Sequence, residues 1–125
     1  MLKIMYCVRR RPEMSREEFD RYWIEQHAPL VRSQADRIGI RRYIQTVPLG
    51  NPEAQRRLQA SRGAEAVDFD GCAELWYDDM ESHLAARNTP EGLRAVQRLI
   101  EDERRFIDLS RAQLWYGTER SVIPE

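Results

Sequence analysis

Three side chains of this sequence are of types that can move protons, namely His27, Tyr43 and Glu74. His27 follows Phe19 and Trp23 at helical intervals, so it lies on the apolar stripe of an otherwise polar segment. An imidazole whose pKa is near its ordinary value of about 6.5 can accept and return a proton at neutral pH. A histidine at such a position can also be a core residue that bonds to a backbone carbonyl or a tyrosine. The spacing leaves both interpretations open.

Glu74 interrupts an apolar segment that has the pattern of a strand. A carboxylate there either pairs with an arginine or faces a pocket, because unpaired charges are rarely buried. Tyr6 and Tyr43 can supply hydroxyl groups, while Trp23 and Trp76 can form the walls of a site for an aromatic ligand. Such aromatic residues are also common in hydrophobic cores that bind no ligand.

The motifs of several other chemistries are missing from the sequence. It contains no HExxH, HxxxH or Cys/His cluster and no Gly-rich phosphate loop, so neither a metal site nor a nucleotide site is expected. His83, the only other histidine, is expected to be structural or solvent-facing. Cys7 and Cys72 have no CxxC partner and are expected to be unpaired, small hydrophobic residues.

The composition fits one ordinary domain spanning residues 1–125. The chain has 20 Lys plus Arg against 21 Asp plus Glu, and this balance argues against a general surface for nucleic acid or anionic membrane. No apolar run approaches the roughly 18 residues of a membrane span. A strand pattern begins at Leu2 and leaves no room for a signal peptide, so a cytoplasmic location is expected.

The pattern of apolar residues predicts an α+β fold of the ferredoxin-like βαββαβ type with a four-stranded antiparallel sheet. Strands are expected at 2–8, 40–47, 72–77 and 112–117, and helices at about 16–35 and from the Asp78-Asp79 cap to about Ile107 with a restart at Thr89-Pro90. Ser15 and Glu18 form a capping-box spacing, and Gly39 is expected to end the first helix. Pro29 should kink that helix or end its first segment, one turn after His27.

Two further expectations concern the surface. Residues 51–70 contain few apolar side chains and are predicted to form a helical and loop insertion or lid, with a short helix to about Ala60. The strands carry apolar residues on both faces, so one face should meet the protein's own helices and the other the sheet of a second subunit. A homodimer with packed sheets is therefore predicted.

Four segments, spread over nearly the whole chain, resemble a known family. They are Trp23 with His27-Ala28-Pro29-Leu30, Gly71 with Glu74-Leu75-Trp76-Tyr77, Thr89-Pro90-Glu91-Gly92, and Asp102-Glu103-Arg104-Arg105-Phe106-Ile107-Asp108. Together they resemble the EthD domain family. The resemblance implies a dimeric α+β barrel with a pocket between each subunit's helices and sheet, and chemistry that usually needs no metal or organic cofactor. More distantly the chain is similar to the methylmuconolactone isomerases, which match it at His27 and Tyr43.

The leading hypothesis is a cofactor-independent lyase or isomerase that acts on a small cyclic or aromatic carbonyl metabolite. His27 would remove a proton next to the carbonyl, Tyr43 would bond the developing enolate oxygen, and Glu74 would orient the imidazole or return the proton. Substrate-binding roles are predicted for Tyr6, Trp23 and Trp76. Two alternatives remain open, a cofactor-free monooxygenase and a non-catalytic dimeric small-molecule-binding protein, with a haem-binding barrel as a weaker one.

Overall fold

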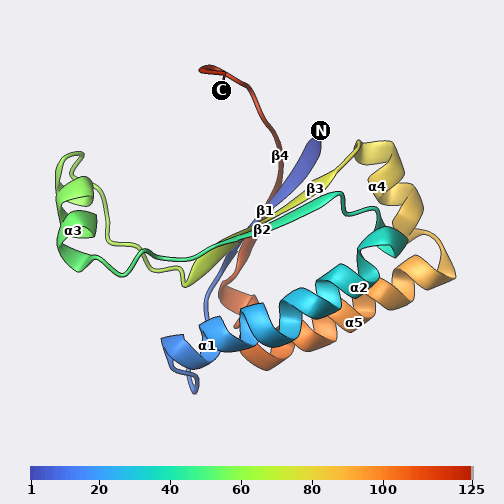
Figure 1. Ribbon diagram of the computed structural model, residues 1–125, viewed down its shortest axis with the longest axis horizontal. Coiled ribbons are helices and arrows are strands. Elements are labelled where there is room, and N and C mark those ends of the chain that lie inside the picture. The colour runs from blue at the N-terminus through green and yellow to red at the C-terminus, as the bar shows by residue number, and fades with distance from the viewer. Residues whose placement is uncertain (125) are drawn as a thin grey trace.

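A four-stranded antiparallel sheet carries helices on one of its faces in the computed structural model, which describes residues 1–124 (Figure 1). The strands are β1 (Leu2–Val8), β2 (Arg42–Thr46), β3 (Gly71–Tyr77) and β4 (Gln113–Thr118), in the spatial order β2-β3-β1-β4. The helical elements are α1 (Arg16–Tyr22), the π-helical turn η1 (Trp23–His27), α2 (Ala28–Ile38), α3 (Pro52–Ala60), α4 (Met80–Arg87), α5 (Pro90–Phe106) and the 3₁₀ turn η2 (Leu109–Arg111). The predicted ferredoxin-like order of elements is confirmed.

The local start and stop signals act as the sequence predicts. Ser15 accepts a hydrogen bond from the Glu18 backbone, and the Glu18 carboxylate accepts one from the Ser15 backbone, which completes the capping box of α1. The Thr89 hydroxyl accepts a hydrogen bond from the Gly92 backbone N–H and so caps the start of α5. Gly39 ends α2 with a φ of 74°, a left-handed conformation that glycine adopts without strain.

Pro29 changes the first helix without ending it. Because proline has no N–H, one helical hydrogen bond is missing, and the preceding turn widens into the π-helical turn η1, in which the Ala28 N–H donates to the Trp23 carbonyl. His27 is the last residue of that widened turn. The predicted irregularity therefore lies immediately before Pro29, at the histidine.

Two clusters of buried side chains join the helices to the sheet. One contains Phe19, Trp23 and Phe106, and the other contains Ile38 and Leu99. Trp23 packs so closely on β3 that a Cβ built on Gly71 would lie 2.5 Å from its ring. Only glycine fits there without a shift of the indole.

The chain from 51 to 70 extends away from the sheet, and α3 contains no buried residue (Figure 1). None of these residues is among those that line the cavity beside His27, so the lid function stays a prediction. Cys7 and Cys72 lie opposite each other on β1 and β3 as free thiols, with 3.7 Å between their Sγ atoms, and both are only half-buried. Within residues 1–124, every helix is too short or too polar to cross a bilayer.

Candidate active site

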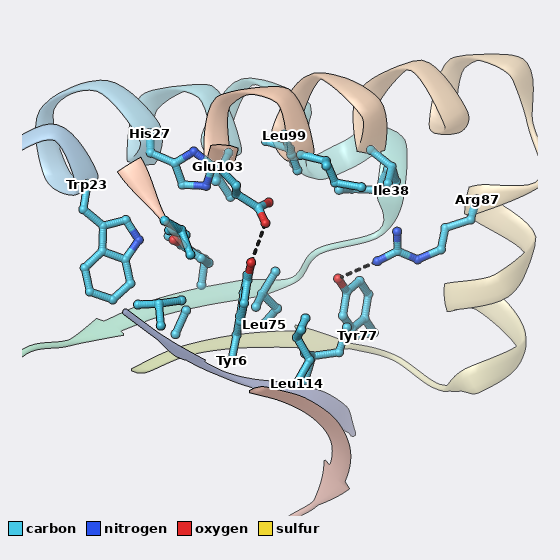
Figure 2. A pocket seen from close by; sticks show the side chains of 18 residues that line it. Tyr6, Trp23, His27, Ile38, Leu75, Tyr77, Arg87, Leu99, Glu103 and Leu114 are labelled. Atoms are coloured by element: carbon cyan, nitrogen blue, oxygen red, sulfur yellow. Dashed lines mark hydrogen bonds between the residues drawn. The ribbon is translucent and has the colours of Figure 1, made fainter. Parts of the chain in front are cut away.

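A cavity of about 200 Å³ lies between the sheet and the α2 and α5 layer (Figure 2). Most of its wall is apolar and comes from the inner face of the sheet and from the helices above it. The polar or aromatic lining residues are Tyr6, Trp23, His27, Tyr43, Tyr77, Arg87 and Glu103. A concave, largely apolar space with a few polar groups is the usual form of a small-molecule site.

His27 is 4% exposed and is held by a carboxylate from α5. Its Nδ1 lies 2.8 Å from Oδ2 of Asp102, whose other oxygen accepts a hydrogen bond of 2.5 Å from the Tyr22 hydroxyl. A carboxylate at Nδ1 favours the tautomer with the proton on that nitrogen. Nε2 forms no hydrogen bond within the described residues, and it is left with a lone pair on a side chain that lines the cavity.

Burial lowers the pKa of His27 below its ordinary value, and the bond and charge of Asp102 only partly oppose this effect. The imidazole is therefore neutral at physiological pH. A neutral imidazole with an unprotonated Nε2 is in the form that a general base requires.

Glu103 is the residue after Asp102 and lies over the same cavity. Its Oε1 accepts a hydrogen bond of 2.7 Å from the Tyr6 hydroxyl (Figure 2). Burial raises the pKa of Glu103 to about 7, even though the bond from Tyr6 acts in the opposite direction. Near neutral pH this carboxyl group exists in both protonation states, so it can donate or accept a proton.

Tyr43 lines the cavity from β2. Its hydroxyl oxygen accepts a hydrogen bond of 3.2 Å from the amide of Gln45, which leaves its own O–H free to donate. Burial raises the pKa of Tyr43, so the group stays protonated. The structure thus brings together His27, Tyr43, Tyr6 and Trp23 of the predicted site residues.

Glu74 and Trp76 lie on the opposite face of the sheet, so the predicted role of Glu74 beside the imidazole is wrong. In the register of β1 and β3, Glu74 pairs with Met5 while Ala73 pairs with Tyr6, which places Glu74 and Tyr6 on different faces. Lys3 Nζ lies 2.5 Å from the Glu74 carboxylate and 4.9 Å from the centre of the Trp76 ring. The imidazole is oriented by Asp102 instead.

Asp102 and Glu103 were missed by the sequence prediction, although a signal for both was present. Two rows of α5 face the interior, and each has one acidic residue among apolar ones. The first row is Ala95, Leu99, Asp102 and Phe106. The second row is Val96, Ile100, Glu103 and Ile107. An acid on an apolar row is the same kind of signal that singled out His27.

Arg87 of α4 lines the other end of the cavity, and His83 of the same helix contacts it from outside the lining. His83 is 1% exposed, and its Nε2 lies 2.9 Å from the Tyr116 hydroxyl and 3.2 Å from Nε of Arg87. Its structural role agrees with one of the two expectations from the sequence. In residues 1–124, no three His, Cys, Asp or Glu side chains gather in positions that could hold a metal ion.

The fold, with its cavity between the helices and the sheet, is that of the ferredoxin-like α+β proteins. Residues 11–110 match the model of the EthD domain, and the chain belongs to this family. The solved structure of an EthD-family protein from Bacillus halodurans has a TM-score of 0.61, with 26% identity over 96% of this chain and 100% of that one. A dimeric ferredoxin-like protein of unknown function from Thermobifida fusca has a TM-score of 0.57 at 11% identity, covering 94% of this chain and 90% of that one.

Two fungal enzymes are similar in sequence. A dehydratase of conidial pigment biosynthesis from Metarhizium robertsii is 28% identical over 112 residues, which cover 86% of this chain and 75% of that protein. A decarboxylase from Claviceps purpurea is 25% identical over 120 residues, which cover 93% of this chain and 81% of that protein. Both of these distant relatives are lyases.

Proposed function

We propose that this protein is a cofactor-independent lyase or isomerase that transfers protons on a small cyclic or aromatic carbonyl compound. The observation that carries the proposal is the pair of His27 and Asp102, which presents a neutral imidazole to an apolar cavity. The dehydratase and the decarboxylase among the relatives support lyase chemistry.

In the first step, Nε2 of His27 removes a proton from the carbon next to the carbonyl group. Negative charge develops on the carbonyl oxygen, and the free O–H of Tyr43 donates a hydrogen bond to it. Asp102 stabilises the imidazolium that forms, because it already accepts the proton of Nδ1.

In the second step, a dehydratase must protonate the departing hydroxyl group. Protonated Glu103 donates this proton, water leaves, and a carbon–carbon double bond forms. In an isomerase, His27 would instead return its proton to another carbon of the enolate. Tyr6 holds the Glu103 carboxyl group in place through its hydrogen bond.

We also propose that the protein acts as a homodimer formed through the outer face of its sheet. This face contains the half-exposed side chains of Met5, Ile44 and Trp76, and Trp115 beside them is 49% exposed. Apolar strands exposed on one face favour association with a second sheet. The dimeric neighbour from Thermobifida fusca supports a dimeric state.

The test uses six-membered cyclic β-hydroxy ketones, whose dehydration gives a conjugated product with a new ultraviolet absorbance. His27→Asn should lower kcat by about 10²-fold or more, because general base catalysis is lost. Arg98→Gln, a change at an exposed position of α5, is the control and should leave kcat unchanged. Full activity of His27→Asn, or oxygen uptake that matches turnover, would overturn the proposal.

A further inference from the structure

Arg87 is the one basic side chain among the described residues that line the cavity, apart from the neutral His27. It comes from the last turn of α4, is half-buried, and reaches towards Tyr77 at the end of the cavity away from Trp23 (Figure 2). In residues 1–124, no carboxylate lies within 4.0 Å of its guanidinium group. Glu103, the acid in the same cavity, bonds to Tyr6 instead.

Neutral groups hold the guanidinium in position. Nη2 donates to the Tyr77 hydroxyl over 3.3 Å, and Nε donates to Nε2 of His83 over 3.2 Å. Tyr77 and His83 are each 1% exposed, so the arrangement is fixed by the core. Burial and the charge of Arg87 lower the pKa of His83, which keeps its imidazole an acceptor.

This arrangement leaves the positive charge of Arg87 without an anion. Nη1 forms no hydrogen bond within the described residues, and most of the cavity wall is apolar. A half-buried charge loses solvation, and only an anionic partner compensates for this loss fully. The planar guanidinium group is suited to carboxylates, which it binds through charge-assisted hydrogen bonds.

We propose that Arg87 binds a carboxylate of the substrate, so that the substrates are small cyclic or aromatic acids. The acid group lies at the Arg87 end of the cavity, and the reacting carbon lies at the His27 end. The assignment of the reacting end rests on the proposed function, whereas the binding of the acid does not. A cavity of about 200 Å³ is smaller than the usual site for a drug-sized ligand, which favours compact acids.

The position of the acid also separates two lyase reactions. In a decarboxylation, negative charge leaves the carboxylate in the transition state, so an ion pair with arginine would stabilise the ground state and slow the reaction. In a dehydration, the carboxylate keeps its charge, and the ion pair only orients the substrate. Arg87 therefore favours dehydration or isomerisation over loss of the bound carboxylate.

The experiment measures binding of 2-naphthoate and of its neutral analogue 2-naphthamide by isothermal titration calorimetry at pH 7.5. The wild-type protein should bind the acid about tenfold or more tightly than the amide. Arg87→Gln should remove this preference and leave the Kd of the amide unchanged, and Arg87→Lys should keep part of it. Arg98→Gln is the matched control on α5 and should behave as the wild type.

His27→Asn should keep the preference for the acid even though its turnover is lost, so a failure of the proposed chemistry is distinguishable from a failure of this proposal. Melting temperatures of all variants establish that each is folded, and Arg87→Lys serves in place of Arg87→Gln if the latter unfolds. Equal affinity for acid and amide, absence of binding of both, or a preference that survives in Arg87→Gln would overturn the role of Arg87.

Discussion

Acidic side chains on the two sides of the sheet have opposite environments, one buried beside a cavity and one paired with a lysine. On the inner side, Glu103 lines the cavity from α5, and burial raises its pKa to about 7. On the outer face, Glu74 lies in a direct ion pair with Lys3, and their side chains are 22% and 15% exposed. Glu74 interrupts an apolar strand and Glu103 interrupts an apolar row of α5, yet only Glu103 lines the cavity.

This difference shows why we propose a chemical role for Glu103 and a structural one for Glu74. Glu74 is paired with Lys3 and does not line the cavity, so it cannot reach a substrate bound there. A carboxyl group that is buried and held by a tyrosine can exist in either form. We therefore expect proton transfer on the inner side of the sheet and association through its outer face.

The largest expected effect comes from Asp102→Asn, which tests whether the inner face depends on an anion beside the imidazole. The amide can donate a hydrogen bond to Nδ1, which would place the imidazole proton on Nε2 and remove the base. We expect kcat to fall by about 10² to 10³-fold. The measurement is turnover of the cyclic β-hydroxy ketones, with circular dichroism to establish the fold. A loss below threefold would mean that Asp102 does not position His27.

Glu103→Gln should have the next largest effect, about 10²-fold on kcat near neutral pH. Because the pKa of His27 is lowered and that of Glu103 is raised to about 7, activity should rise with pH as His27 loses its proton and fall as Glu103 loses its own. The variant should lack the decrease above pH 7 in kcat/KM. An unchanged profile would assign that decrease to another group.

The same substitution has a consequence for stability. The folded-state pKa of Glu103 is above its ordinary value of 4.5, so the stabilisation from its proton is complete below pH 4.5 and is lost as pH rises through about 7. Glu103→Gln should remove this pH dependence, which amounts to about 3 kcal/mol in the free energy of unfolding between pH 4.5 and about pH 7. Urea unfolding at pH 5 and pH 8 measures it.

The elements of the fold could be predicted because their signals are local. Ser15, Thr89 and Gly39 define helix ends through contacts within a few residues, and all three act as expected. The π-helical turn was foreseen only as a break at Pro29, since the sequence does not say whether a missing N–H ends a helix or widens it.

The site could be predicted only in part because it depends on faces and on long-range register. Helical phase predicts the inward position of His27, whereas the sequence leaves the face of Glu74 open, because a shift of one residue exchanges the two faces of a strand. Asp102 lies 75 residues after His27, and no local signal connects the two. Only the interrupted apolar rows of α5 indicate that its acids point inwards.

Trp115→Lys tests the outer face as an association surface. Trp115 is 49% exposed and pairs with Met5 across β1 and β4, so a lysine there would place a charge in the proposed dimer interface. We expect the dimer Kd to rise about tenfold or more, as measured by sedimentation equilibrium. Leu93→Lys on the outer side of α5, at a position 52% exposed, is the control and should leave the Kd unchanged. A monomeric wild-type protein would contradict the proposed dimer.

The smallest expected effect belongs to Glu74→Gln, the outer-face counterpart of Glu103→Gln. The substitution removes the ion pair with Lys3, and partly exposed ion pairs contribute at most about 1 kcal/mol to the free energy of unfolding. Because Glu74 faces away from the cavity, kcat and its pH profile should stay within twofold of the wild type. Glu74→Gln could instead reduce the fall in kcat/KM above pH 7 as much as Glu103→Gln does. Groups on both faces of the sheet would then take part in proton transfer. The separation of a reactive inner face from an associating outer face would then be wrong.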